Sequence, residues 1–268
     1  MARRELNQSR VIVTGASSGI GQALARRLAA CQARLLLTAR REDRLRQLAD
    51  EIEPQADGVS WIAGDITDAS VRQQIRRHVD EQWQGLDLLI NNAGIGSRGS
   101  FATSTAEELQ RVMEVNFFAP AEFSRELLPQ LRQGRQPMIV NVGSVLGHRA
   151  VPLKSEYCAS KFALHGFSDA LRAELAAEGI DVLLISPSTT RSEFFDVAAG
   201  RPAGSSDPAS RRGMSTDKVA RKSLQAIRRG KHELILPCSG KLLVWADRLL
   251  PGLVNRLLAK RASKQSDQ

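Results

Sequence analysis

The sequence predicts an α/β protein built on a doubly wound parallel sheet, with helices packed on both faces. Apolar β-rich runs alternate with helical patterns from one end of the 268-residue chain to the other. Strand, helix, strand at this spacing requires right-handed crossovers, which make the strands parallel. No internal repeat or linker interrupts the alternation. Residues 1–238 are therefore predicted to form one domain, and residues 239–268 an amphipathic C-terminal extension.

The predicted strands are short apolar runs, and the predicted helices carry apolar residues every three or four positions. In chain order the strands are 10–14 (RVIVT), 34–39 (RLLLTA), 58–63 (GVSWIA), 86–91 (LDLLIN), 137–142 (PMIVNV), 180–186 (IDVLLIS) and 233–236 (ELIL). The helices between them are 19–30, 41–52, 69–83, 105–131, 155–178 and 216–229. Charged residues separate the apolar positions of each helix, as expected for a helix with one face on a sheet.

One tract does not fit this alternation. Residues 188–215 are rich in Gly, Ser, Pro and Arg and are too long for an ordinary connection in a compact domain. We expect this tract to be mobile and to act as a lid.

The C-terminal extension reads as two short amphipathic helices broken at Pro251-Gly252. Its apolar residues Leu242, Trp245, Leu249 and Leu253 need cover. Packing on the parent domain or on a twin subunit would provide it. The alternative is peripheral attachment of residues 240–261 to an anionic membrane surface, because Lys and Arg flank the tryptophan.

Composition favours a soluble cytoplasmic protein. Hydrophobic residues make up 42% of the chain and can fill a sizeable core. The three cysteines are scattered and form no CxxC pair, which fits a reducing compartment. Neither a signal peptide nor a long uncharged apolar run is found. The histidines His78, His148, His165 and His232 form no ligand pattern, so no metal is predicted.

The net charge of +9 raises the question of nucleic-acid binding. The basic residues, however, are interspersed with acids along helical stretches, and a single tyrosine is available to stack on bases. A solvated charged face explains this pattern better, with some arginines serving an anionic cofactor. No nucleic-acid partner is predicted.

A glycine-rich turn follows the first predicted strand and opens the first predicted helix. It runs Thr14-Gly-Ala-Ser-Ser-Gly-Ile-Gly21. Glycines let the backbone approach a phosphate group, and the helix N-terminus attracts negative charge. The candidate cofactor residues in this turn are Gly15, Ser17, Ser18, Gly19, Ile20 and Gly21.

The second predicted strand ends in Arg40 and Arg41, where an acidic side chain would grip the ribose 2′-hydroxyl of NAD. Two guanidinium groups suit a 2′-phosphate instead, and Arg44 follows one helical turn later. NADP(H) is therefore predicted over NAD(H). The alternative is that these arginines only decorate the start of a helix, where the helix dipole disfavours cations.

Tyr157 is the only tyrosine of the chain and stands four residues before Lys161. On a helix these two positions share a face, with Cβ atoms about 5–6 Å apart. A fixed ammonium group favours the ionised phenol and lowers its pKa toward the working range. The pair is therefore a candidate acid/base, although an exposed helix pair would show the same spacing.

Taken together, these motifs resemble the short-chain dehydrogenase/reductase family, in its single-domain branch with a Rossmann-type sheet. The resemblance runs from about Ser9 to Leu236. The glycine turn resembles the cofactor turn of the family, and Asn91-Asn-Ala-Gly94 resembles its fourth-strand signature. Asn116, Ser144, Tyr157 and Lys161 stand in the catalytic order and context of the family.

The resemblance implies a role for each of the four catalytic candidates. Tyr157 would exchange a proton with the substrate oxygen, and Lys161 would lower its pKa and contact the nicotinamide ribose. Ser144 would orient the substrate oxygen, with capping of a turn as its alternative. Asn116 would open a helix kink that holds a proton-relaying water, with a solvent-facing side chain as its alternative.

Further cofactor contacts are implied along the carboxyl edge of the sheet. Asp65 and Ile66 would lie at the adenine, with a helix N-cap as the alternative for Asp65. Asn92, Ala93 and Gly94 would lie at the adenosine ribose, and Pro187, Thr190 and Ser192 at the nicotinamide end. Where the family has Pro-Gly after its sixth strand, this chain has Pro187-Ser188. A positive φ there would cost Ser188 about 1 kcal/mol, unless the loop takes another shape.

The sequence thus predicts an NADP(H)-dependent oxidoreductase that interconverts a small-molecule carbonyl and an alcohol, as a homodimer or homotetramer. Phe194 and Phe195 indicate a lipophilic substrate. A non-catalytic nucleotide-sensing scaffold on the same fold is the alternative, although such a protein would be expected to lose reacting side chains. A sugar-nucleotide epimerase would need a longer C-terminal part.

Overall fold

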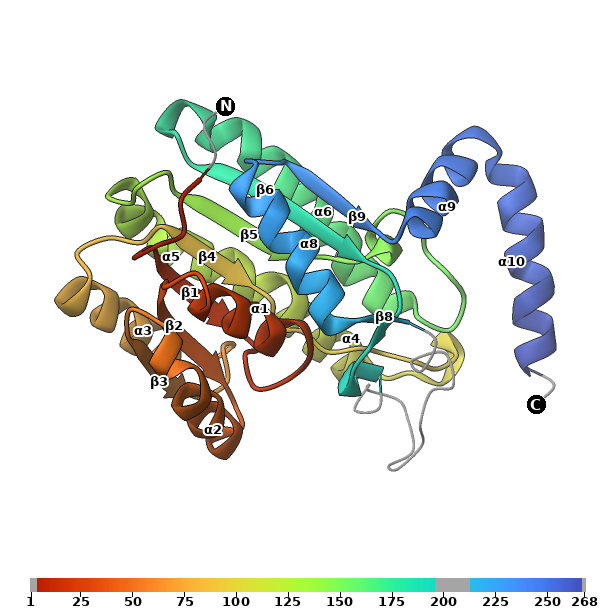
Figure 1. Cartoon of the computed structure of the whole chain (residues 1–268). Coiled ribbons are helices and arrows are strands. Elements are labelled where there is room, and N and C mark those ends of the chain that lie inside the picture. Colours follow the sequence, from red (N-terminus) through yellow and green to blue (C-terminus); the bar gives the residue numbers. More distant parts are fainter. Residues whose placement is uncertain (1–3, 196–212, 267–268) are drawn as a thin grey trace.

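Seven parallel strands form the central sheet of the computed structural model, which describes residues 4–195 and 213–266 (Figure 1). Their order is β3-β2-β1-β4-β5-β6-β9. The strands are β1 (Arg10–Thr14), β2 (Arg34–Ala39), β3 (Val59–Ala63), β4 (Leu88–Asn91), β5 (Met138–Val142), β6 (Asp181–Pro187) and β9 (Glu233–Leu236). This arrangement confirms the predicted doubly wound α/β sheet of Rossmann type, and every predicted strand end lies within two residues of the observed one.

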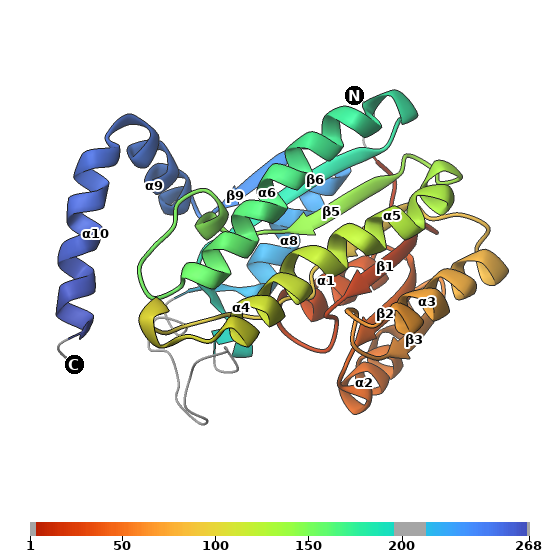
Figure 2. The ribbon, with the colours of Figure 1, turned by 180° about the vertical axis from the view of Figure 1, so that it is seen from behind.

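Helices cover both faces of this sheet. One layer contains α1 (Gly19–Ala29), α2 (Glu42–Ile52) and α8 (Thr216–Arg228), and the opposite layer, in front in Figure 2, contains α3 (Ala69–Gln82), α5 (Ala119–Arg132) and α6 (Ser155–Leu175). Side chains alternate between the faces of a strand. Val11 and Val13 accordingly pack in the same cluster as Leu24 of α1, whereas Ile12 packs in the same cluster as Phe123 of α5. All five are fully buried.

The strand order reverses beside β1, which pairs with β2 on one side and β4 on the other. The connections after β1 and β4 therefore diverge and leave a crevice at the carboxyl ends of the strands. The Thr14 side chain ties the two connections together, because its Oγ1 accepts hydrogen bonds from the amides of Asn92 and Ala93, each at 2.9 Å. The fold thus places the glycine turn against the Asn92-Ala93-Gly94 segment.

Two predicted helices are broken in the structure. The predicted helix 105–131 consists of α4 (Ala106–Met113), a π-helical turn at Glu114–Phe118, and α5. The predicted helix 155–178 ends as an α-helix at Leu175 and closes with a 3₁₀ turn, Ala176–Glu178. Gly179 follows with φ of 69°, a left-handed conformation that stops the helix.

The tract at 188–215 is more ordered at its ends than the sequence indicates. Strands β7 (Thr190–Arg191) and β8 (Met214–Ser215) pair in parallel and form a second, two-stranded sheet. A 3₁₀ turn follows at Glu193–Phe195, and residues 196–212 of the predicted lid lie outside the described residues.

The C-terminal extension forms α9 (Cys238–Leu249) and α10 (Pro251–Ser266), and α10 stands away from the sheet in Figures 1 and 2. Val244 is buried, but Leu242, Trp245, Leu249 and Leu253 are 55–71% exposed. The alternative in which these four side chains pack on their own domain is therefore wrong. None of the helices within residues 4–195 and 213–266 combines the length and apolar character needed to cross a bilayer.

Candidate active site

The glycine turn after β1 leaves no room for a side chain at two of its glycines. Gly15 has φ of 64°, and a Cβ there would lie 2.9 Å from the Cα of Ala93. A Cβ on Gly21 would lie 2.4 Å from the carbonyl oxygen of Gly15. Ser18 is the N-cap of α1, yet its side chain makes no capping hydrogen bond. The turn therefore fits a phosphate group, which amides at a helix N-terminus bind well.

A cavity of about 540 Å³ extends from this turn along the carboxyl ends of the strands. Its size suits a cofactor and a small substrate. The predicted cofactor residues that line it are Gly15, Ser17, Ser18, Gly19, Ile20, Arg40, Arg41, Asp65, Ile66, Asn92, Ala93, Gly94, Pro187, Thr190 and Ser192. The predicted catalytic residues Ser144, Tyr157 and Lys161 line it as well. The predicted residues Gly21 and Asn116 do not line this cavity.

At the far end of the cavity Tyr157 and Lys161 lie one turn apart in α6, both about 95% buried. The Lys161 Nζ is 5.8 Å from the centroid of the Tyr157 ring and donates a hydrogen bond to the carbonyl oxygen of Val142 at 2.9 Å. Burial raises the pKa of Tyr157 to about 12 and lowers the pKa of Lys161 to about 8. The expectation that Lys161 lowers the pKa of Tyr157 is thus not met, because burial dominates both groups.

Ser144 follows β5 and caps a turn, which is one of the two roles considered for it. Its Oγ caps the 3₁₀ turn Val145–Gly147 by accepting a hydrogen bond from the Leu146 amide at 3.1 Å. It is also hydrogen-bonded to the Tyr157 side chain, which works against the effect of burial on the pKa of the phenol. Two hydroxyl groups therefore meet on one wall of the cavity, where a substrate oxygen could contact both.

Asn116 occupies the π-helical turn, as the kink implied by the family resemblance requires. Its side chain is 1% exposed, so the solvent-facing alternative is wrong. Its amide nitrogen donates to the Ile95 carbonyl and to the Ser160 hydroxyl, each at 2.9 Å, and its Oδ1 accepts from the Ile95 amide at 2.8 Å. Asn116 thereby fixes the strand connection beside Gly94 against the helix that carries Lys161.

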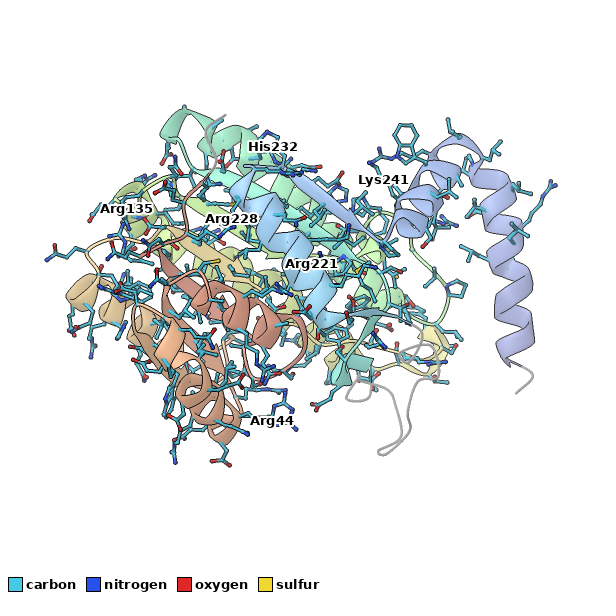
Figure 3. The ribbon with its side chains drawn as sticks, in the orientation of Figure 1. Arg44, Arg135, Arg221, Arg228, His232 and Lys241 are labelled. Atoms are coloured by element: carbon cyan, nitrogen blue, oxygen red, sulfur yellow. The ribbon has the colours of Figure 1, made fainter. Side chains whose placement is uncertain are left out.

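At the adenosine end, Arg41 donates hydrogen bonds to the hydroxyl groups of Ser17 at 3.2 Å and Ser18 at 2.7 Å. Arg40 lines the same part of the cavity and is exposed. Arg44 extends from α2 at the lower edge of the view in Figure 3. The arginines thus surround a polar pocket instead of merely decorating the start of α2.

A model of the short chain dehydrogenase family matches residues 9–199. The chain belongs to the short-chain dehydrogenase family. Among its relatives, dehydrogenase/reductase SDR family member 7B of Bos taurus is 35% identical over 265 residues, which cover 95% of this chain and 82% of the relative. The dehydrogenase/reductase SDR family protein 7-like of Anopheles gambiae is 35% identical over 271 residues, or 97% and 85% of the two chains.

Solved structures of short-chain dehydrogenases share the whole fold. A short-chain dehydrogenase from Sphingobium yanoikuyae in complex with NADPH has a TM-score of 0.75 and 28% identity, and the match covers 97% of this chain and 96% of that one. A short-chain dehydrogenase/reductase from Burkholderia phymatum in complex with NAD has a TM-score of 0.84 and 24% identity, over 93% and 96% of the two chains. This short-chain dehydrogenase is accordingly an oxidoreductase with the sheet topology of its family.

Several cavity residues of this short-chain dehydrogenase were not indicated by its sequence. They are Arg111, Lys154, Glu193 and Leu243, which come from four separate segments. Burial raises the pKa of Asp65, but the hydrogen bond that Arg111 donates and the bonds from Thr67 outweigh burial and leave this pKa below its usual range. The helix cap after β3 is Asp68, so the N-cap alternative for Asp65 is wrong.

The serine that replaces glycine after β6 needs no unusual backbone. Ser188 has no positive φ, and its amide donates to the Leu236 carbonyl of β9 at 2.7 Å. The loop of this short-chain dehydrogenase therefore has a backbone conformation that any residue can adopt. The strain that a positive φ at Ser188 would have caused is absent.

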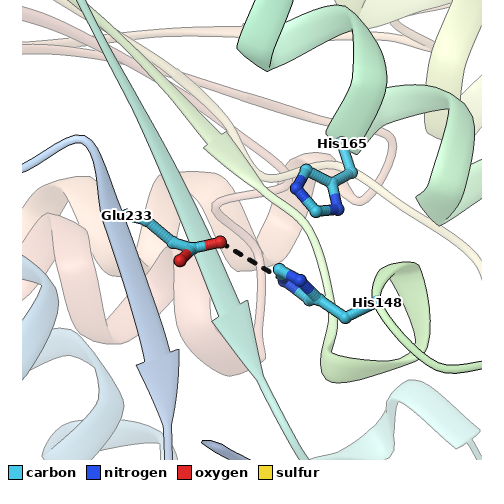
Figure 4. A group of neighbouring side chains, drawn as sticks. All are labelled: His148, His165 and Glu233. Atoms are coloured by element: carbon cyan, nitrogen blue, oxygen red, sulfur yellow. Dashed lines mark ion pairs between the residues drawn. The ribbon is translucent and has the colours of Figure 1, made fainter. Parts of the chain in front are cut away.

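A cluster of two histidines and a glutamate lies beside the turn after Ser144, although the sequence spacing does not indicate it (Figure 4). His148, His165 and Glu233 bring potential ligand atoms within 4.8 Å of one another. His148 Nε2 lies 2.9 Å from the Ser186 hydroxyl and 3.7 Å from the Glu233 carboxylate. Burial, and then the neighbouring His165 and the Arg248 charge, lower the pKa of His148 to about 4. His148 is therefore a neutral, buried support of the Ser144 turn in this short-chain dehydrogenase.

Proposed function

We propose that the protein is an NADP(H)-dependent oxidoreductase that interconverts a carbonyl and an alcohol by hydride transfer. The observation that carries the proposal is the meeting of three side chains, Ser144, Tyr157 and Lys161, in one cavity with the glycine turn. A phenol and a hydroxyl group beside a phosphate-binding turn are the parts that this reaction needs.

A nicotinamide nucleotide is the cofactor of this proposal, since related structures hold NAD, NADPH or 5-hydroxy-NADP. Those structures include both cofactor types. The preference for the phosphorylated form rests instead on Arg40 and Arg41, which line the cavity directly after β2. A guanidinium pair binds a 2′-phosphate through charge-assisted hydrogen bonds.

In the proposed mechanism the bound nicotinamide supplies or accepts the hydride. Tyr157 exchanges the proton with the substrate oxygen, and Ser144 holds that oxygen through its hydroxyl group. The Tyr157 phenol, whose pKa burial raises from 10 to about 12, is protonated at neutral pH and can donate to a carbonyl oxygen. Lys161 would hold the cofactor ribose through its ammonium group, and Asn116 would support the proton relay to Lys161.

The proposed substrate is a lipophilic small molecule. The cavity wall near Tyr157 is built from Val145, Leu146, Val151, Phe194 and Leu243, with Lys154 among them. Apolar side chains around two hydroxyl groups favour a carbonyl compound with an apolar body. The Phe195 side chain, which also indicated such a substrate, lies outside the described residues.

The proposed assembly is a homodimer or homotetramer in which a twin subunit covers the exposed face of α9 and α10. Leu242, Trp245 and Leu249 of α9 and Leu253 of α10 are each more than half exposed, on a chain with a net charge of +9. The same basic, amphipathic character would suit an anionic membrane surface, which is the alternative occupant.

A panel of carbonyls and alcohols, followed at the absorbance of reduced nicotinamide with both cofactors, tests the proposed function. Turnover with NADPH that is lost in Tyr157→Phe is expected, since the variant keeps the ring and removes the exchangeable proton. Unchanged turnover in that variant would overturn the mechanism. Tight NADPH binding without turnover on any compound would instead favour the nucleotide-sensing scaffold.

A further inference from the structure

Glu193 places a carboxylate of the chain itself on the arginines of the adenosine end. Its Oε2 accepts a hydrogen bond from Arg41 at 3.0 Å, and both of its oxygens accept from Arg44 at 2.8 and 3.0 Å. The two guanidinium groups hold the pKa of Glu193 below its usual range. Arg41 binds Ser17 and Ser18 at the same time. An anion thus already occupies the place where a ligand phosphate would meet Arg41.

The next residue, Phe194, reaches the opposite end of the cavity. Its ring packs edge-on against Tyr157, with 5.8 Å between the centroids and an angle of 63° between the ring planes. Phe194 also lies 3.8 Å from the point where a Cβ on Gly94 would be. Two consecutive side chains therefore connect the arginines of the adenosine end with the candidate acid/base.

We propose that Glu193 determines cofactor specificity as an internal competitor that a 2′-phosphate displaces from Arg41 and Arg44, and that its release moves Phe194 away from Tyr157. The inference rests on the proposed preference for NADP(H). A phosphate carries more charge and more acceptor oxygens than a carboxylate, so it binds the guanidinium groups more strongly and displaces the Glu193 carboxylate. A ribose 2′-hydroxyl has no charge and leaves Glu193 in place.

The strength of the Glu193 contacts suits a displaceable group. Glu193 is 51% exposed and its arginines are 42% and 44% exposed. Ion pairs this exposed are weak, and salt screens them. A bound phosphate can therefore break both pairs, whereas without it they are sufficient to hold the Glu193-Phe194 segment against the cavity.

Binding of adenosine 2′,5′-bisphosphate and adenosine 5′-monophosphate, measured by calorimetry, tests the competition. We expect Glu193→Gln to bind the bisphosphate about three- to ten-fold more tightly than the wild type, and the monophosphate equally well. Glu178→Gln is the control, because Glu178 pairs with Arg132 and does not line the cavity. Unchanged bisphosphate affinity, or weaker monophosphate binding in Glu193→Gln, would overturn the inference.

The coupling to Phe194 has its own readout, because Tyr157 is the only tyrosine. Its ionisation can be followed by tyrosinate absorbance with adenosine fragments bound, so no nicotinamide charge intervenes. We expect the bisphosphate to lower the apparent pKa of Tyr157 in the wild type and the monophosphate to leave it unchanged. Glu193→Gln should show the lower value without ligand. Equal titrations in all four samples would disprove the coupling.

Failure of the proposed cofactor preference can be told apart from failure of this inference. If neither the wild type nor Glu193→Gln binds the bisphosphate more tightly than the monophosphate, the arginines do not bind a 2′-phosphate. The proposed NADP(H) preference and the proposed role of Glu193 are then both wrong. If both proteins prefer it to the same extent, the cofactor proposal stands and Glu193 is no competitor.

Discussion

Lys161 and Tyr157 lie one helical turn apart in α6, and burial disfavours the charged form of both side chains. It lowers the pKa of Lys161 and raises the pKa of Tyr157. With a pKa of about 8, Lys161 loses its charge at a lower pH than Tyr157, whose pKa is about 12. At the pH where Tyr157 ionises, Lys161 is therefore already neutral, and no ammonium charge stabilises the tyrosinate. The pair favours a protonated phenol at neutral pH, which is the form that donates to a carbonyl oxygen.

The titration of Tyr157 should show this directly. At pH 10.5 about three quarters of a free tyrosine is ionised, whereas the folded protein without cofactor should show almost no tyrosinate absorbance. Tyr157→Phe provides the blank and urea-unfolded wild type the reference. Substantial tyrosinate in the folded protein at this pH would contradict the burial argument.

Lys161 should make the stability of the cofactor-free protein depend on alkaline pH. Its pKa is about 8 in the folded state, against 10.5 for a lysine side chain that burial does not perturb, so the unfolded chain binds more protons between these pH values. The free energy of unfolding should therefore rise from pH 8 to 10.5, by up to about 3 kcal/mol. Urea denaturation should show this rise in the wild type and in the exposed-site control Lys231→Met, but not in Lys161→Met.

Replacing Arg41 by alanine should weaken NADPH binding roughly 10- to 100-fold, because charge-assisted hydrogen bonds are worth about 1.5–3 kcal/mol. Arg40→Ala should have a smaller effect, since Arg41 alone contacts Ser17 and Ser18. NADH affinity should change little in either variant. Arg46→Ala is the control, because Arg46 pairs with Glu42 and does not line the cavity. An equal loss of NADH affinity would contradict a role in phosphate recognition.

Protonation of His148 should lower the free energy of unfolding in acid. Its pKa is about 4 in the folded state against 6.5 normally, so the unfolded chain binds more protons in this window. The free energy of unfolding should fall as the pH falls from 6.5 to 4, by up to about 3 kcal/mol. Thermal melts of His148→Gln should depend less on pH over this range, and those of His232→Gln should follow the wild type. Identical pH profiles in all three proteins would refute the assignment.

Changing Leu249 and Leu253 to glutamine should reduce the oligomeric state without lowering the melting temperature of the subunit, because both side chains are exposed within one chain. Light scattering measures the mass. Co-sedimentation with anionic and neutral vesicles measures the alternative. If the mass stays the same and wild type alone binds anionic vesicles, the membrane surface is the occupant and the twin-subunit proposal is wrong.

The sheet could be predicted because a parallel α/β fold follows from patterns that lie close together in the chain. The run at 10–14 and the glycine turn after it identify a strand, a turn and a helix within about twenty residues. The break at Asn116 was implied only by the family resemblance, since a buried asparagine and a solvent-facing one look alike in a helical pattern.

Features that depend on distant contacts could not be predicted. Glu193 lies in a tract without periodicity and meets Arg41 and Arg44 across 152 and 149 residues. The cluster of His148, His165 and Glu233 forms only when α6 and β9 are in place. The pKa of Tyr157 depends on how deeply the ring is buried, which a sequence motif does not specify.

Leu243 of α9 lines the cavity together with Tyr157, although it stands outside the predicted catalytic domain. The proposed reacting groups and part of the wall proposed to select their substrate therefore belong to different parts of the chain. Altering α9 would retune which compounds are accepted and leave the bond-making chemistry intact. Association of the extension with another surface would, in turn, act on the cavity wall through Leu243 and through Gly240, which packs beside Val145.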